Sequence, residues 1–368
     1  MKEVFTSFIY DNPIPRLYAR NSAFPYLCEL SDGRILAMHQ MGQAFESVDG
    51  TTCCSESLDG GRTWSKPWRA FDKSRETVPL TDGSKPMRLP GGRVVAVGYQ
   101  YPRPDPELPI GNDVTGGLLD DEVYWAYSDD DGRTWSERFH IDTAWGPHAE
   151  ASAPLTLLQD GSWATPITGF PTWEGHMTAR RCGRLLRSFD QGATWSDDVV
   201  CMAFPGDGVT CYEQRMCQLD DGAIVVIGWN EDVRTGERFN NHYTISADNG
   251  RSFSEPRDTG IRGQASSLCP LGGTKLLSIH ACRRDTDRPG IYGYVVDLAD
   301  GAWRVESGEL LWAPDYPVVK DRGMAEIFSF LAFGQPSAIR LADGDLLLCF
   351  WYCEQGRYKT VARRLKMQ

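Results

Sequence analysis

The chain has 368 residues, and its 38 lysines and arginines stand against 50 aspartates and glutamates, for a formal net charge of −12. Such an acidic chain is a poor partner for nucleic acid or for an anionic membrane surface. No stretch approaches the roughly 20 apolar residues that a membrane-spanning helix needs, and the first residues lack the apolar centre of a signal peptide. We therefore expect a cytoplasmic protein with neither nucleic acid nor membrane as a partner.

In chain order, the most regular pattern is an apolar run, an Asp-Gly or Gly-Gly turn, and a second apolar run. Such a turn between apolar runs predicts a β-hairpin. The pattern occurs six times, with its second turn glycines at Gly33, Gly92, Gly161, Gly222, Gly273 and Gly344, at intervals of 59, 69, 61, 51 and 71 residues. Each interval suits one four-stranded unit, so the sequence predicts an all-β, six-bladed β-propeller formed by residues 1–368 as a single domain.

A second repeat follows the first four hairpins. Residues 57–64, 128–135, 188–195 and 246–253 all read Ser-x-Asp-x-Gly-x-Ser/Thr-aromatic, and residues 300–303 keep a remnant. The Ser and Asp side chains can bond nearby backbone N–H groups, and the Gly permits a positive φ, so each copy predicts a turn. The pattern resembles the Asp-box of sialidases, a structural turn between the outer strands of a propeller blade. We call these four segments the Asp-box turns and expect them between the third and fourth strands of their blades.

Ring closure is expected to use the two ends of the chain. The last blade lacks an Asp-box turn, and the chain ends shortly after residues 358–365. Residues 4–10 form an apolar strand that can pair with that stretch and remove an open sheet edge.

Cysteine usage gives no sign of a metal centre or a disulfide framework. The eleven cysteines include the adjacent pair Cys53 and Cys54, and none has Cys-x-x-Cys spacing. We expect reduced, mostly buried thiols. Neither a zinc signature nor a phosphate-binding glycine loop is present, so the sequence indicates no cofactor and no metal.

Candidate site residues follow from the geometry of a propeller. The innermost strand of each blade lines the central channel, so polar residues some seven to thirteen positions before a turn glycine, or at the end of the second strand, should meet at one mouth. Glu213, Glu150 and His39 are the catalytic candidates from this reasoning. The substrate-binding candidates are Arg20, Lys85, His148, Tyr212, Trp229, Gln264, His280, Arg283 and Gln335. Carboxylates, histidines and cations with aromatic walls are typical of a site for a polar ligand such as a sugar.

The resemblance to sialidases adds two candidate site residues and argues against the family's usual reaction. It places Asp49 in the loop that carries the family's acid/base aspartate, and Arg288 at the third carboxylate-binding arginine, with Arg283 and Arg284 as rivals. Ala23 and Trp229 stand where the family has its other two arginines, and Gln335 replaces the tyrosine nucleophile next to the matching Glu213. Because the family needs that tyrosinate and those guanidinium groups, cleavage of sialic acid by the usual route is not expected.

The sequence therefore predicts a sialidase-like glycoside hydrolase, exo-acting on a glycan other than an ordinary sialoside, with an anionic sugar as one option. Glu213 and Glu150 are the leading acid/base pair, and each can alternatively be a structural carboxylate. Two other functions stay open. One is a uronide lyase on the same fold, with a histidine or tyrosine base and Arg20 or Lys85 neutralising the sugar acid. The other is a glycan-binding propeller without catalysis. Carbohydrate is the expected partner, and the oligomeric state is not predicted.

Overall fold

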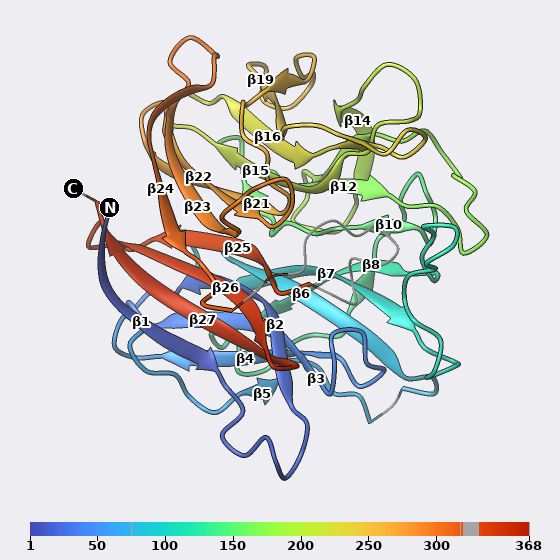
Figure 1. Cartoon of the computed structure of the whole chain (residues 1–368), viewed down its shortest axis with the longest axis vertical. Coiled ribbons are helices and arrows are strands. Elements are labelled where there is room, and N and C mark those ends of the chain that lie inside the picture. The colour runs from blue at the N-terminus through green and yellow to red at the C-terminus, as the bar shows by residue number, and fades with distance from the viewer. Residues whose placement is uncertain (75, 317, 319–330, 368) are drawn as a thin grey trace.

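The computed structural model describes residues 1–74, 76–316, 318 and 331–367. Within these residues the strands form six antiparallel sheets arranged as blades around a common centre, and one separate two-stranded hairpin (Figure 1). The protein is an all-β, six-bladed β-propeller, which confirms the predicted fold class. No described segment is helical, and no helix in that part of the chain could cross a membrane.

The first three blades follow one another along the chain, each running from its inner to its outer strand in sequence order. Blade 3 differs in having its inner strand broken into two pieces that both pair with the second strand. The strands are β2 (Asn21–Glu29), β3 (Ile35–Gly42), β4 (Thr51–Ser57) and β5 (Trp68–Arg69) in blade 1; β6 (Leu80–Arg88), β7 (Val94–Pro102), β8 (Glu122–Ser128) and β9 (Phe139–His140) in blade 2; and β10 (Ala149–Glu150), β11 (Thr156–Leu157), β12 (Trp163–Gly169), β13 (Gly183–Ser188) and β14 (Ser196–Met202) in blade 3.

The last three blades repeat this arrangement, and a short hairpin lies in the loop between the second and third strands of blade 4. The strands are β15 (Tyr212–Gln218), β16 (Ile224–Trp229), β19 (His242–Ser246) and β20 (Arg257–Asp258) in blade 4, with the hairpin β17 (Glu231–Asp232) and β18 (Glu237–Arg238); β21 (Ser266–Gly272), β22 (Lys275–Cys282), β23 (Gly290–Asp297) and β24 (Arg304–Trp312) in blade 5; and β25 (Phe333–Arg340), β26 (Leu346–Glu354), β27 (Arg357–Lys366) and β1 (Lys2–Tyr10) in blade 6.

The ring closes through the N-terminal strand. β1 pairs antiparallel with β27, from Lys2 opposite Lys366 to Tyr10 opposite Thr360, and thereby becomes the outermost strand of blade 6. Figure 1 shows the two ends of the chain side by side at this blade. The predicted closure is confirmed, and the strand begins two residues before the predicted start.

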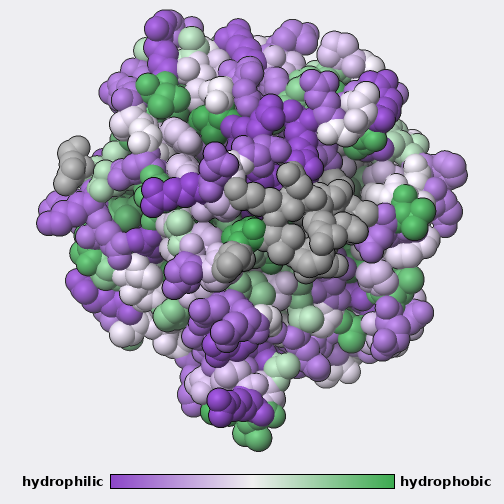
Figure 2. Space-filling model, in the orientation of Figure 1, coloured by the Kyte–Doolittle hydropathy of each residue, from purple (hydrophilic) through white to green (hydrophobic). Residues whose placement is uncertain are grey.

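The core lies between neighbouring blades. The second strand of a blade is covered on both faces, so it is apolar without alternation: Val94, Val95, Ala96 and Val97 of β7 are all 0% exposed. Since the apolar side chains are used between blades, the face seen in Figure 2 is mostly hydrophilic, with apolar residues in small separate groups. All eleven cysteines are described and free, and all are buried except the half-buried Cys353, as expected from the sequence.

The Asp-box turns join the third and fourth strands of blades 1 to 4, as predicted. In blade 2, Ser128 Oγ donates to Asp130 Oδ1 (2.8 Å) and accepts a hydrogen bond from the buried N–H of Gly132 (2.8 Å). Asp130 also accepts hydrogen bonds from the N–H and the hydroxyl of Thr134, at 2.8 and 2.6 Å. The same contacts recur in the other three turns. The motif is therefore a hydrogen-bonded corner of the blade.

The substitution Ser128→Ala tests the energetic value of one such corner. It leaves the buried N–H of Gly132 without its partner, which should lower the free energy of unfolding by about 1–3 kcal/mol. Urea denaturation measures the loss. Ser74→Ala, which removes an exposed hydroxyl bonded only to Asp72, is the matched control and should change stability little. Equal midpoints for the two variants would show that the corner does not stabilise the blade.

Candidate active site at the channel mouth

A cavity of about 140 Å³ lies where the inner strands of the blades begin and the second strands end. All six blades contribute to its lining. The lining residues are Phe24, Gln40, Phe45, Glu46, Thr81, Tyr99, Tyr101, Ile110, Leu118, Glu150, Phe170, Tyr212, Glu213, Trp229, Arg283, Leu331 and Gln335.

Three equivalent backbone positions turn side chains into this cavity. Phe24, Glu213 and Gln335 each lie nine residues before the turn glycine of their blade, and they have φ values of +52°, +43° and +41°. The strand pairing shifts register at the same point in all three blades. A bulge of this kind re-aims a side chain, and non-glycine residues with positive φ are strained. The three strained positions therefore converge on one cavity.

Glu213 is held by donors on both carboxylate oxygens. Trp229 Nε1 donates to Oε2 at 2.9 Å, and Gln335 Nε2 donates to Oε1 at 2.5 Å. Gln335 is itself oriented by Trp351, whose indole N–H donates to its Oε1. Because indole and amide N–H groups only donate, Glu213 acts as an acceptor in both contacts.

Glu150 has a different environment, next to Lys85 and Tyr99. Burial raises the pKa of Glu150 to about 7, against the opposing effects of the Lys85 charge and a hydrogen bond from Tyr99. Burial also lowers the pKa of Lys85, whose Nζ donates to the carbonyl of Ala151 at 2.8 Å and lies 4.1 Å from the centroid of the Tyr99 ring. Glu150 therefore holds a proton more readily than an exposed carboxyl group does.

A guanidinium group crosses the channel beneath the two glutamates. Arg215 Nη1 donates to the carbonyls of Glu213 (3.0 Å) and Gln214 (2.9 Å). The same nitrogen donates to Ser152 Oγ at 3.0 Å, and Nη2 donates to the hydroxyl of Tyr26 at 2.8 Å. That hydroxyl in turn donates to the carbonyl of Ser152 at 2.9 Å. We call these contacts the Arg215 bridge; they join blades 1, 3 and 4 and fix the bulge that carries Glu213.

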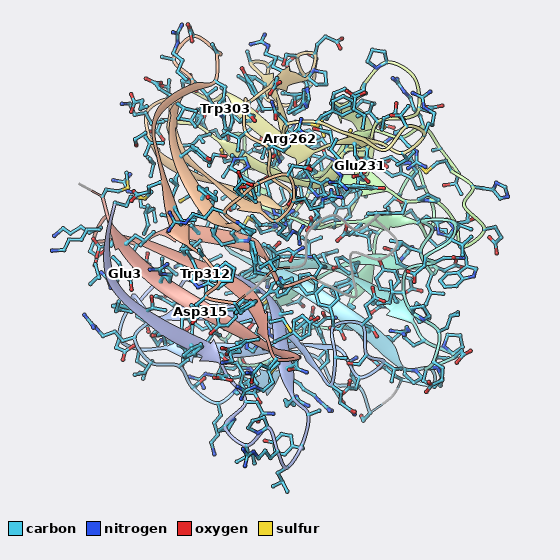
Figure 3. All side chains as sticks on the ribbon, viewed as in Figure 1. Glu3, Glu231, Arg262, Trp303, Trp312 and Asp315 are labelled. Carbon is cyan, nitrogen blue, oxygen red and sulfur yellow. The ribbon has the colours of Figure 1, made fainter. Side chains whose placement is uncertain are left out.

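Two further arginines lie on the side of blades 4 and 5. Arg283 lines the cavity, its Nη1 donates weakly to Phe333 O at 3.4 Å, and its Nε finds no hydrogen-bond partner among the described residues. Burial lowers the pKa of Arg283 to about 10, while the charge of Glu213 acts in the opposite direction. Arg284 instead pairs with Glu231 at 3.2 Å, and Figure 3 labels Glu231 in its hairpin. Arg283 is therefore the arginine positioned to meet a ligand.

The structure separates the sequence candidates into three groups. Those that line the cavity are Glu150, Tyr212, Glu213, Trp229, Arg283 and Gln335. Two more adjoin it: Lys85 lies below Tyr99, and Gln264 accepts the backbone N–H of Arg283 at 2.8 Å. The candidates that do not line it are Arg20, His39, Asp49, His148, His280 and Arg288.

Two of the three buried histidines, His39 and His280, are hydrogen-bonded to serines and do not line the cavity. His39 Nδ1 is 2.7 Å from Ser22 Oγ and its Nε2 is 3.1 Å from Ser55 Oγ. His280 Nε2 is 2.7 Å from Ser278 Oγ. Burial lowers the pKa of each histidine to about 3, so both are neutral at physiological pH.

The remaining four candidates have other surroundings. The charge of Arg20 acts on the thiol of Cys53, and Asp49 Oδ1 accepts the N–H of Gln43 at 3.0 Å within its own loop. His148 Nε2 is 3.8 Å from Asp120, and Arg288 is exposed in the loop between β22 and β23. None of these four residues lines the cavity.

Sequence reasoning missed Glu46 and Arg215. Glu46 lies three residues before Asp49 in the same loop and lines the cavity, where burial raises its pKa. The resemblance drew attention to the aspartate of that loop and away from the glutamate. Arg215, Lys85 and Tyr26 all stand seven residues before their turn glycines, and this common spacing could have identified a layer of polar groups beneath the mouth.

No protein-family model matches the chain, and no curated protein matches it. Its likeness to solved structures is a likeness of fold, that of sialidase-type six-bladed propellers. A protein of unknown function from Dyadobacter fermentans is 18% identical, with a TM-score of 0.74 over 100% of this chain and 99% of that one. The Hadza microbial sialidase Hz136 is 17% identical, with a TM-score of 0.68 over 94% of this chain and 66% of that one. The intramolecular trans-sialidase from Ruminococcus gnavus, solved with oseltamivir carboxylate, is 12% identical, with a TM-score of 0.64 over 94% of each chain.

Proposed function

We propose that this propeller is a glycoside hydrolase that removes a terminal sugar, with Glu213 and Glu150 as its two reacting carboxyl groups. The observation that carries the proposal is the pair of carboxyl groups in one cavity with different environments. Glu213 accepts two hydrogen bonds, whereas Glu150 is half-buried and the loss of surrounding water raises its pKa to about 7. Two carboxyl groups whose environments separate their proton affinities are the usual equipment of glycosidases.

The proposed reaction assigns one role to each group. Protonated Glu150 donates its proton to the glycosidic oxygen as the bond from the anomeric carbon to that oxygen breaks. The Glu213 carboxylate stabilises the positive charge that develops on the sugar, either by bonding to the anomeric carbon or by taking a proton from the attacking water. The products are the free sugar, which gains the water oxygen, and an alcohol.

The substrate differs from an ordinary sialoside. The indole of Trp229 and the amide of Gln335 both donate to Glu213, so neither position offers a guanidinium group or a nucleophile. Arg283 lines the cavity, where its guanidinium group can bind an acidic group if the sugar has one. Tyr212 stacks on Phe170 with ring centroids 5.3 Å apart, which offers an aromatic surface beside the carboxylates.

A panel of neutral, uronic and sialic aryl glycosides, together with uronic oligosaccharides, tests the proposal. Release of the aryl alcohol without an unsaturated sugar supports hydrolysis. Formation of an unsaturated uronide would replace hydrolysis with a lyase reaction, and binding without turnover would replace it with a non-catalytic role.

The pH profile of the cleaved glycoside tests the assignment of Glu150. A general acid must carry its proton, so kcat/KM should be highest below pH about 7 and fall as pH rises through that value. Glu213 raises the pKa of Glu150, whereas Lys85 and Arg215 lower it. Removing the positive charge in Lys85→Met should therefore move the alkaline limb to higher pH. Lys275→Met, on the exposed pair with Glu306, is the control and should leave the limb in place. An unmoved limb in Lys85→Met would exclude Glu150 as the acid.

A further inference from the structure

The outer end of the cavity is formed by loops, whereas its deep end is formed by strands. The loops are residues 43–50 between β3 and β4, residues 103–121 between β7 and β8, and residues 170–182 between β12 and β13. They contribute Phe45, Ile110, Leu118 and Phe170 to the cavity lining. We call these four side chains the apolar wall.

A buried arginine joins the first two loops. Arg103 is 2% exposed, and its Nη1 donates to the carbonyl of Glu46 at 2.9 Å and to Thr81 Oγ1 at 3.1 Å. Its Nη2 donates to the carbonyl of Leu108 at 2.6 Å. The side chain of Glu46 is turned to the second loop as well, since its Oε2 accepts the N–H of Ile110 at 3.1 Å. The carboxylate of Glu46 is therefore already hydrogen-bonded to the backbone of the second loop.

The second and third loops are joined in a similar way. The N–H of Leu118 donates to the carbonyl of Pro171 at 3.1 Å, and Thr115 Oγ1 donates to the carbonyl of Trp173 at 2.7 Å. Asn112 Nδ2 donates to the same carbonyl at 2.9 Å. The apolar wall is therefore preorganised, and a ligand that binds it does not have to order the loops first.

We propose that the apolar wall binds the leaving group of the substrate and that this group is apolar, an aryl or alkyl aglycone. This inference rests on the proposed function, because the glutamates identify the deep end as the place of the sugar. In an exo-acting hydrolase the departing group then lies at the loops. Burying an apolar group there is favourable in proportion to its area, whereas a hydroxylated sugar would lose water without gaining hydrogen bonds from these side chains.

The test measures binding to the Glu213→Gln protein, in which turnover is blocked. The probes are phenyl and methyl glycosides of glucose, galactose, N-acetylglucosamine and glucuronic acid. For the sugar that binds, the phenyl glycoside should bind about tenfold more tightly than the methyl glycoside, as expected for burying most of one aromatic ring.

Substitutions in the apolar wall, compared with a control substitution outside it, show whether the wall causes the phenyl preference. In the Glu213→Gln background, Phe45→Ala and Ile110→Thr should each reduce the phenyl preference at least about threefold. Val114→Thr lies on the same loop as Ile110, is 93% exposed, and should retain the preference. Two independent wall variants guard against the failure of one to fold.

The outcomes separate this inference from the proposed function. A phenyl preference that the wall variants abolish, in a protein whose wild type cleaves none of the phenyl glycosides, supports the wall and refutes hydrolysis. Cleavage of phenyl glycosides with equal binding of the phenyl and methyl series refutes the wall and supports hydrolysis. The proposal for the apolar wall is also overturned if Val114→Thr loses the phenyl preference as much as the wall variants do. It is likewise overturned if neither the phenyl nor the methyl glycosides bind.

Discussion

The variant Glu213→Gln is expected to lose glycosidase activity by about 10²- to 10⁴-fold in kcat/KM, the range typical for removing an acid–base or nucleophilic group. The amide is nearly the same size as the carboxylate, so the cavity keeps its shape. Its oxygen can still accept the N–H of Trp229, but its NH₂ group faces Gln335 Nε2, another donor. Stability should therefore fall only by the value of one hydrogen bond, about 1 kcal/mol.

Steady-state kinetics with the best aryl glycoside, together with thermal unfolding, measure the two effects separately. Glu306→Gln, on the outer strand β24, is the matched control because it makes the same chemical change far from the cavity. The anomeric configuration of the sugar that the wild-type protein releases separates the two roles of Glu213, because retention identifies it as the nucleophile and inversion identifies it as the base. Retained activity in Glu213→Gln would remove this residue from the mechanism.

Deletion of residues 2–10 is expected to have the largest effect on stability. These residues supply β1, so their removal leaves β27 as an open sheet edge and breaks the closure of the ring. The strand also joins blade 6 to blade 1, since the indole of Trp64 donates to Ser7 Oγ (3.2 Å) and that hydroxyl donates to Gly61 O (2.5 Å). With about 1 kcal/mol for each lost ladder bond, the loss should exceed about 5 kcal/mol, a large part of the total for a typical protein.

Thermal unfolding and light scattering measure the loss of stability and the aggregation that an open edge promotes. A synthetic peptide of residues 1–12, added to the truncated chain, should restore the melting temperature, and a scrambled peptide should not. Leu17→Ser changes an exposed side chain, 78% accessible, in the loop after β1 and should be neutral. An unchanged melting temperature after the deletion would mean that the N-terminal strand is dispensable for closure.

The fold could be predicted from the sequence because each blade contains short local motifs that identify it. The turn glycines and the Asp-box turns depend on a few adjacent residues, and their spacing counts the blades. Glu213 and Gln335 could be placed for the same reason, since they share the distance to the turn glycine of their blade. What the sequence did not show is that both lie in bulges with positive φ, because a bulge arises from the pairing of two strands.

The histidines show that a small difference in strand register makes a prediction of site residues wrong. His39 is six residues after its turn glycine, and Gln40, the next residue, is the one that lines the cavity. Neighbouring residues of a strand point to opposite faces, so a shift of one position sends the imidazole between the blades.

His280 lies seven residues after its turn glycine, as Gln40 does, but blade 5 has a different register. His280 pairs with Ser266, which lies seven residues before its turn glycine. In blade 1 the residue at that position is Tyr26, and it pairs with Met38. The hairpin turn of blade 5 is shorter than that of blade 1, so His280 lies deeper in the channel than Gln40 does. Only the observed strand pairing shows this displacement.

The Arg215 bridge has a consequence for the order in which molecules enter and leave. By joining blades 1, 3 and 4, it places a guanidinium group across the channel among the described residues, so we expect ligands to enter and leave through the mouth. In the proposed reaction the sugar sits beneath the leaving group, so the alcohol must depart before the sugar can. Release is then sequential, and the free sugar, the last product to go, competes directly with the next substrate molecule for the empty protein.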